Sequence, residues 1–205
     1  MPILTEYRLA FRHGFHLGTR GVNLEESSIT LPADTLFAAL LDIYRRAGGD
    51  PEAFVGPFPR LLVNGQSVSG APPFLLTSAF PFAGGVRFFP RPAALSPFFC
   101  QETLDARRKE IEKIHFVSEQ VFDRALTGEP LDDWLFPQDE REEPRSDSGV
   151  ALQGGTFWLT AAEVKDIPSG LRPRSRHGGQ NLRALRYQRA YATSKVPRVT
   201  VDRLS

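Results

Sequence analysis

The chain has 205 residues with a formal net charge of +1, and 41% of its residues are hydrophobic, including 16 Phe. This composition fits a packed fold with one sizeable core or two small domains. The single cysteine, Cys100, excludes an internal disulfide framework and a four-thiolate metal site, and we expect it to be buried or half-buried. No signal peptide opens the chain, and prolines and glycines interrupt the uncharged segment between Arg60 and Arg87. We therefore expect a cytoplasmic protein without a membrane helix.

The N-terminal part predicts a strand, a loop and a helix. Residues 7–11 alternate between apolar and polar or small side chains, which is typical of a half-buried strand. A helix follows from about residue 32, with Asp34 as its N-cap and Gly48-Gly49 at its end. Few polar positions remain on this helix, so we expect it to be buried on most sides. A buried helix N-terminus that points at the basic loop of residues 13–18 can bind an anion.

Residues 54–101 contain no Asp or Glu, but they hold nine of the 16 Phe and eight of the 17 Pro. Short strands and ordered loops fit this segment better than a helix or a disordered linker. Residues 76–82 and 86–92 flank Ala83-Gly84-Gly85 and predict a β-hairpin with Gly84-Gly85 at its tip. Its aromatic residues either pack in the core, which composition favours, or project and stack on nucleic-acid bases.

The middle of the chain combines a charged segment with residues whose spacing predicts strands and a helix. These are a charged segment at 102–112, a strand at 114–117, a helix at 118–126 and a strand at 156–160. Ser118 is the expected N-cap of the helix, and Gly128 ends it. Residues 129–147 contain eight acidic residues against two arginines, which predicts a solvated loop or a surface that docks a protein partner.

The charge reverses at the end of the chain. Residues 171–205 contain eight arginines and one lysine against a single acid, Asp202. Nine cations repel one another unless a polyanion is present, and Tyr187 and Tyr191 lie among them. Arg and Tyr together suit phosphates and unstacked bases, so this region predicts RNA binding. Residues 196–203 predict an edge strand within it.

Motifs for other chemistries are absent from the sequence. It lacks a phosphate-binding Walker loop, a dinucleotide fingerprint, paired zinc histidines and a serine-hydrolase elbow, so we expect no metal and no cofactor. His16 lies beside Gly14, Gly18 and Arg20 and has the chemistry of a general acid or base. Because no second titrating partner is evident, a non-catalytic role for His16 is favoured.

Seven short motifs, taken in order along the chain, resemble one family. They are HGFHLG at 13–18, GVNLEES at 21–27, DTLFAAL at 34–40, TSAFPF at 77–82, FFPRP at 88–92, KIHFVS at 113–118 and PRVTVDR at 197–203. Each motif is weak alone, but their combination resembles the Cas five-like, Csm four-type RAMP subunit of type III-A CRISPR effector complexes.

This resemblance implies an α+β, ferredoxin-like (RRM-like) RAMP domain over residues 1–205, with an antiparallel sheet, packed helices and a β-hairpin thumb near residues 80–92. The thumb would lie in an insert of about 54–101, with the acidic loop at 129–147 and the basic region at 171–205. Members of the family continue into a second RAMP-like half, which we expect to be missing here.

The implied function is non-catalytic. Such a subunit caps the crRNA at its 5′ tag and links the large Cas ten-type subunit to the backbone RAMP subunit (Csm three-type). Carried over by position, and together with the basic residues noted above, the RNA-binding residues would be His16, Gly18, Arg20, Asp34, Thr35, Ser78, Phe80, Arg87, Phe88, Arg91, Lys195, Arg198 and Arg203.

Two alternatives remain open. One is a metal-independent RAMP endoribonuclease that processes crRNA with His16 as its general acid or base. The other is a scaffold that contacts only proteins. The RNA-capping hypothesis requires the basic C-terminal region and the Phe-rich hairpin to converge on one nucleic-acid track.

Overall fold

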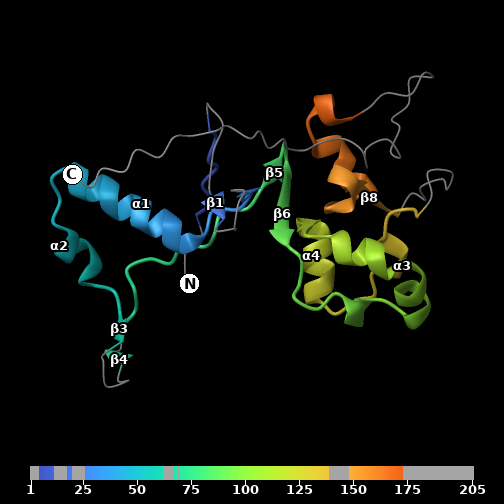
Figure 1. Cartoon of the computed structure of the whole chain (residues 1–205), viewed down its shortest axis with the longest axis horizontal. Helices are drawn as coiled ribbons and strands as arrows, with labels where there is room; N and C mark the ends of the chain where they lie inside the picture. Colours follow the sequence, from blue (N-terminus) through green and yellow to red (C-terminus); the bar gives the residue numbers. More distant parts are fainter. Residues whose placement is uncertain are drawn as a thin grey trace. The chain divides into compact units, whose positions relative to one another are not determined.

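The computed structural model describes residues 5–11, 18–19, 26–61, 67–68, 70–138 and 148–172. The chain divides into two compact units, residues 1–79 and residues 80–205 (Figure 1). No helix in the described ranges is long and apolar enough to cross a bilayer.

The described residues of the first unit form two helices and two short strand pairs. The helices are α1 (Ala33–Arg46) and α2 (Pro51–Val55). The antiparallel pairs are β1 (Gly18–Thr19) with β2 (Glu26–Ser27), and β3 (Arg60–Leu61) with β4 (Ser67–Val68). Residues 5–11 form no strand, and Tyr7 is 82% exposed. The strand predicted there is wrong, because polarity alternation yields a strand only where a neighbour supplies backbone hydrogen bonds.

The predicted helix over 32–47 is confirmed, but its start and its burial differ from expectation. The N-cap is Pro32, which makes no side-chain bond, and Asp34 lies inside the first turn. The predicted Asp34 cap is therefore wrong. The first free N–H, that of Ala33, instead donates to the hydroxyl of Ser78 at 3.2 Å. No residue of α1 is fully buried, and Ile43 is 64% exposed.

Aromatic rings connect α1 to α2 and the chain beyond it. The ring of Phe37 lies 5.7 Å from Phe54 and 5.3 Å from Phe58, while Phe74 lies 5.1 Å from Phe58. Tyr44 completes the group at 5.1 Å from Phe54. Pairs at these separations add about 0.5–1.5 kcal/mol each beyond the area they bury. The first unit thus has a partly exposed aromatic cluster, which accounts for part of the Phe content of residues 54–101.

The second unit is built on a five-stranded sheet. Its strands are β5 (Phe82–Ala83), β6 (Val86–Pro90), β7 (Phe116–Ser118), β8 (Gly149–Leu152) and β9 (Phe157–Thr160), and its α-helices are α3 (Gln101–Lys113) and α4 (Glu119–Leu126). Short 3-10 helices, labelled η, lie between or after them: η1 (Ser96–Phe98), η2 (Asp132–Trp134), η3 (Gln153–Gly155), η4 (Ala161–Asp166) and η5 (Ser169–Leu171). The strand order is β5-β6-β7-β9-β8. All neighbours are antiparallel except β7 and β9, which are parallel. The α+β class is confirmed, whereas the expectation of a purely antiparallel sheet is wrong.

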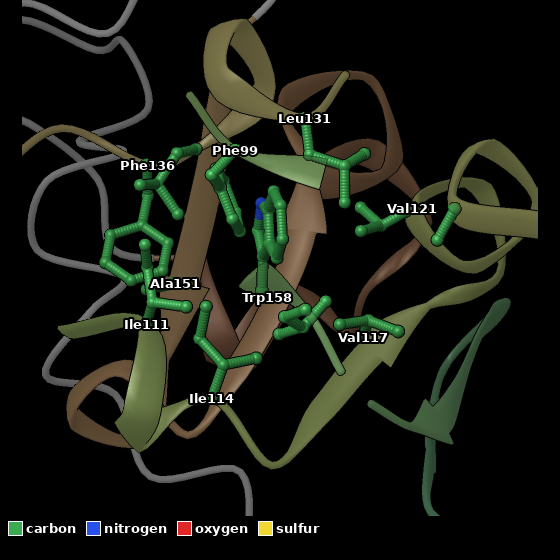
Figure 2. Close-up of a cluster of buried hydrophobic side chains, with 12 residues drawn as sticks. Phe99, Ile111, Ile114, Val117, Val121, Leu131, Phe136, Ala151 and Trp158 are labelled. Atoms are coloured by element: carbon green, nitrogen blue, oxygen red, sulfur yellow. The ribbon is translucent and has the colours of Figure 1, made fainter. Parts of the chain in front are cut away.

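Trp158 of β9 occupies the centre of the core of this unit. It is fully buried and lies among side chains from α3, α4 and the segment after α4 (Figure 2). Its ring stacks on Phe99 at 6.1 Å. On α4, Val121 and Ala125 are buried, so the helical spacing predicted for 118–126 is confirmed. The charged segment at 102–112 lies within α3, whose described residues bury only Ile111.

Part of the acidic segment contributes to the same core. Leu131, Leu135 and Phe136 are at most 4% exposed. Residues 131–136 are therefore not a solvated loop, because their apolar side chains pack in the core with those of α3 and α4, while Asp133 stays exposed. Residues 139–147 lie outside the described ranges.

Candidate nucleic-acid interface

The hairpin predicted with its tip at Gly84-Gly85 is present, but it does not project freely. Ala83 pairs with Val86, and Phe82 pairs with Arg87. At the tip, the N–H of Gly85 donates to the carbonyl oxygen of Asp166 in η4 at 2.8 Å. Gly84 has φ +61°, and a Cβ there would overlap that same carbonyl oxygen. The tip is thus held against η4.

One face of the hairpin belongs to the core. Val86 is 3% exposed and Phe88 is 2% exposed. The ring of Phe88 meets Phe157 edge-on at 5.0 Å. A base cannot stack on a ring buried in this way, so the assignment of Phe88 to RNA is corrected to core packing. Phe80 is partly buried, with its ring 6.3 Å from Phe89.

Arg87 lies on the other face of β6, where it meets the first turn of α4. Its Nε donates to Oε2 of Glu119 at 3.1 Å, and its Nη2 donates to Oε1 of the same carboxylate. The two side chains are 43% and 39% exposed, so the pair lies at the surface. Because both oxygens of Glu119 are engaged, the charge of Arg87 is compensated within the protein.

Arg91 has a local structural role. Its Nη1 donates to the carbonyl oxygen of Ile111 at 3.4 Å, and its backbone N–H donates to the carbonyl oxygen of His115 at 2.9 Å. Ile111 lies in the last turn of α3, and its carbonyl oxygen also accepts from the N–H of Ile114 at 3.2 Å, so Arg91 adds a cationic donor at the negative end of the helix. Arg91 therefore stabilises the C-terminus of α3.

Three predicted site residues gather at the start of α1. The Oγ of Ser78 accepts from Ala33, and Oδ1 of Asp34 accepts from the N–H of Thr35 at 2.7 Å. The side chain of Asp34 is exposed. A carboxylate at this end of the helix occupies the position that favours negative charge, so it opposes a bound phosphate. The anion site expected at this helix is not supported by the described residues.

The remaining predicted residues are only partly covered by the structure. Gly18 lies in β1, opposite Ser27. His16, Arg20, Lys195, Arg198 and Arg203 lie outside the described residues. The convergence of the basic C-terminal region with the hairpin therefore stays a prediction.

Most other described arginines are paired with carboxylates. Arg45 and Arg46 both bind Asp42, at 3.0 and 2.7 Å, and the hydrogen bond from Arg45 lowers the pKa of Asp42. Further pairs are Arg107–Glu110, Arg108–Glu112 and Arg124–Glu129. Paired cations contribute less to polyanion binding than unpaired ones, because the carboxylate repels the phosphate.

Sequence reasoning missed two residues next to Arg87. Phe82 is 44% exposed on the strand facing Arg87, and Glu119 pairs with it from α4. The period-two alternation on the two sides of the glycine tip could have identified Phe82. It places the side chains of residues 82 and 87 on one face of the hairpin and those of 86 and 88 on the other. No local signal pointed to Glu119. Cys100, expected to be at least half-buried, is exposed at the N-cap of α3.

The described residues include no group of three His, Cys, Asp or Glu side chains arranged to hold a metal ion. Comparison with known proteins found no matching family model, no matching curated protein and no matching solved structure.

Proposed function

We propose that this chain is a non-catalytic RNA-binding subunit of a type III-A CRISPR effector complex. In this role it caps the 5′ tag of crRNA and links the large Cas ten-type subunit to the Csm three-type backbone subunit. The observation that carries the proposal is the charge of residues 171–205, with nine cations against one acid. The ordered motif series that resembles the Csm four-type family supplies the more specific role.

Ion pairing among the described residues favours one group of cations for RNA contacts. Most described arginines are already paired with carboxylates, and Arg91 binds a helix carbonyl. The cations of residues 173–205 are therefore the main candidates for phosphate contacts. The finer fold assignment, a ferredoxin-like RAMP domain, is part of the same proposal, and the parallel pairing of β7 with β9 departs from it.

Salt-dependent binding tests the proposal. Fluorescence anisotropy of the full chain with a labelled RNA that carries a repeat-derived 5′ tag should show log K falling linearly with log salt. The variant Lys195→Gln/Arg198→Gln/Arg203→Gln should lower the slope by about 0.7 for each phosphate of the single strand that is no longer neutralised. A matched control is Arg45→Gln/Arg46→Gln/Arg108→Gln, which removes equal charge from side chains that are paired with carboxylates.

Three results would count against the proposal. Absence of RNA binding even at low salt would favour the protein-only scaffold. Equal effects of the two triple variants would show that only net charge matters. Cleavage of a repeat-containing RNA in the presence of EDTA, lost in His16→Ala, would favour the endoribonuclease instead.

A further inference from the structure

Helix α1 has two apolar faces, and only one of them packs on the aromatic cluster of the first unit. That face carries Phe37 and Tyr44. The adjoining face carries Leu36, Leu40 and Ile43, because residues four and three positions apart share one side of a helix. No residue of α1 is fully buried, and Leu40 and Ile43 are 38% and 64% exposed. This second face, which we call the α1 stripe, therefore presents apolar side chains to solvent.

The α1 stripe belongs to a larger apolar surface. Tyr44, one turn after Leu40, is 39% exposed, and Phe74, whose ring lies 6.3 Å from that of Phe37, is 37% exposed. A contiguous apolar surface marks an interaction site, whereas single exposed apolar residues are ordinary. Apolar side chains at intervals of four and three residues form the seam along which two helices pack. The occupant that fits the stripe is therefore another helix.

Charges along α1 favour a second copy of this chain as that occupant. The first turn carries Asp34, and the last turn carries Arg45 and Arg46. In an antiparallel pair of α1 helices centred on Leu40, Arg46 of one copy lies level with Asp34 of the other. Opposite charges and opposite ends of the helix dipoles then meet at both ends of the contact, whereas a parallel pair would bring like charges together. Beside the stripe, Arg46 is bound to Asp42 at 2.7 Å, so its charge is compensated where two stripes meet.

We infer that two copies of this chain associate through the α1 stripe as a symmetric, antiparallel helix pair. A two-fold contact uses the same surface on both copies, so the second copy supplies the apolar spacing and the charge pattern by symmetry. Leu40 lies at the two-fold axis, and Leu36 of one copy lies near Ile43 of the other. The 14 residues of α1 span only about 21 Å, and small interfaces are weak, so the dimer forms reversibly as concentration rises. This inference goes beyond the proposed RNA-binding function and does not depend on it.

Sedimentation equilibrium of the full chain over a concentration series tests the inference. The mean mass of the wild type should rise from the 22.8 kDa of one chain toward twice that value. Ile43→Glu should stay at the mass of one chain, because a dimer would bury two carboxylates in an apolar seam. Leu126→Glu is the matched control, since it makes the same kind of change at an apolar side chain of α4 that is 70% exposed. It should associate as the wild type does.

A mixture of two variants tests the antiparallel register. Leu36→Lys and Ile43→Glu should each lose association when measured alone. In the mixed dimer, the new ammonium lies near the new carboxylate in one half of the seam, and the other half keeps its Leu36–Ile43 contact. The mixture should therefore recover a mass above that of one chain. Thermal melts establish that each variant is folded.

Several results would overturn the inference. They are a wild type that stays at the mass of one chain at every concentration, a dimer that Ile43→Glu leaves intact, and an equal loss in Leu126→Glu. A mixture that does not recover association would also refute the antiparallel pair. Binding of a different protein by a monomeric wild type, lost in Ile43→Glu, would assign the stripe to that protein instead. None of these masses reports on RNA affinity, so the proposed function stands or falls separately in the anisotropy assay.

Discussion

The indole nitrogen of Trp158 donates a hydrogen bond of 2.9 Å to the carbonyl oxygen of Trp134. This bond connects β9, inside the sheet, to η2, in the segment that follows α4. Gly149 on β8 lies against both groups, and a Cβ at this position would overlap the Trp134 carbonyl and the indole. The close approach of these three residues holds the acidic segment onto the sheet.

Replacing Trp158 with Phe should destabilise the protein. The variant leaves the Trp134 carbonyl without its donor, which costs about 1–3 kcal/mol, and the smaller ring adds a cavity. The measurement is the urea midpoint at constant m-value. Trp134→Phe is the control: it keeps the backbone carbonyl, and it weakens the contact of Arg124 with the ring, 4.3 Å from its centroid, and the packing of this partly buried side chain at the edge of the core. A larger loss in the control would contradict the importance of the hydrogen bond.

Gly84→Ala should destabilise the hairpin tip. The φ of +61° is unfavourable for alanine, and its Cβ would overlap the Asp166 carbonyl oxygen. We expect a loss of about 1–3 kcal/mol in the free energy of unfolding, as for other strained backbone positions. Gly85→Ala is the matched control, because its Cβ would lie in ordinary contact with Asp166, at 3.4 Å or more. Equal melting temperatures for the two variants would refute the docked tip.

Asp132 should give the protein an acid-sensitive component of stability. Burial acts to raise the pKa of Asp132, but hydrogen bonds from Thr103 and Cys100 favour the ionised form and lower it below its usual value. A group with a lowered folded-state pKa stabilises the fold above its unfolded pKa of about 3.9, and the effect is lost as pH falls through the folded-state pKa.

Unfolding midpoints across pH therefore check this prediction. Asp132→Asn should be less stable than the wild type at neutral pH, and the difference should shrink below about pH 4. Asp133→Asn, a change at an exposed neighbour, should follow the wild-type profile. A pH-independent difference between wild type and Asp132→Asn would contradict the role of the carboxylate charge.

The Arg87–Glu119 pair should contribute little to stability despite its fork geometry. Both side chains are about two-fifths exposed, and such pairs typically give a coupling of about 0.2–1 kcal/mol. A double-mutant cycle with Arg87→Gln and Glu119→Gln measures this coupling. A value well above that range would mean that the pair fixes α4 against β6, and that each single variant perturbs the fold.

Local signals in the sequence were sufficient for several elements but not for their arrangement. The C-terminal end of α1, the helical spacing of Val121 and Ala125, and the glycine tip of the hairpin all depend on residues within a few positions. The parallel pairing of Phe116 with Phe157 joins residues far apart in the chain, and no local pattern specifies it. Long-range pairing is decided by packing of the whole sheet.

The candidate site shows the same division. Alternation along β6 predicts that Arg87 and Phe88 lie on opposite faces of the strand. Which face is buried depends on the pairing of β6 with β7, and no local pattern specifies that pairing. The pairing of Arg87 with Glu119 likewise depends on where α4 packs. In the acidic segment, the eight acidic residues led to the prediction of a solvated loop. The apolar side chains of Leu131, Leu135 and Phe136 among them pack in the core.

The place of β9 in the sheet has a consequence for synthesis on the ribosome. β9 is inserted between β7 and β8, although it is the last of the five strands to be made. Until residue 160 has left the exit tunnel, β7 lacks its second neighbour and the cavity that receives Trp158 stays open to water. The nascent second unit should therefore gain protease resistance in one late step, instead of strand by strand.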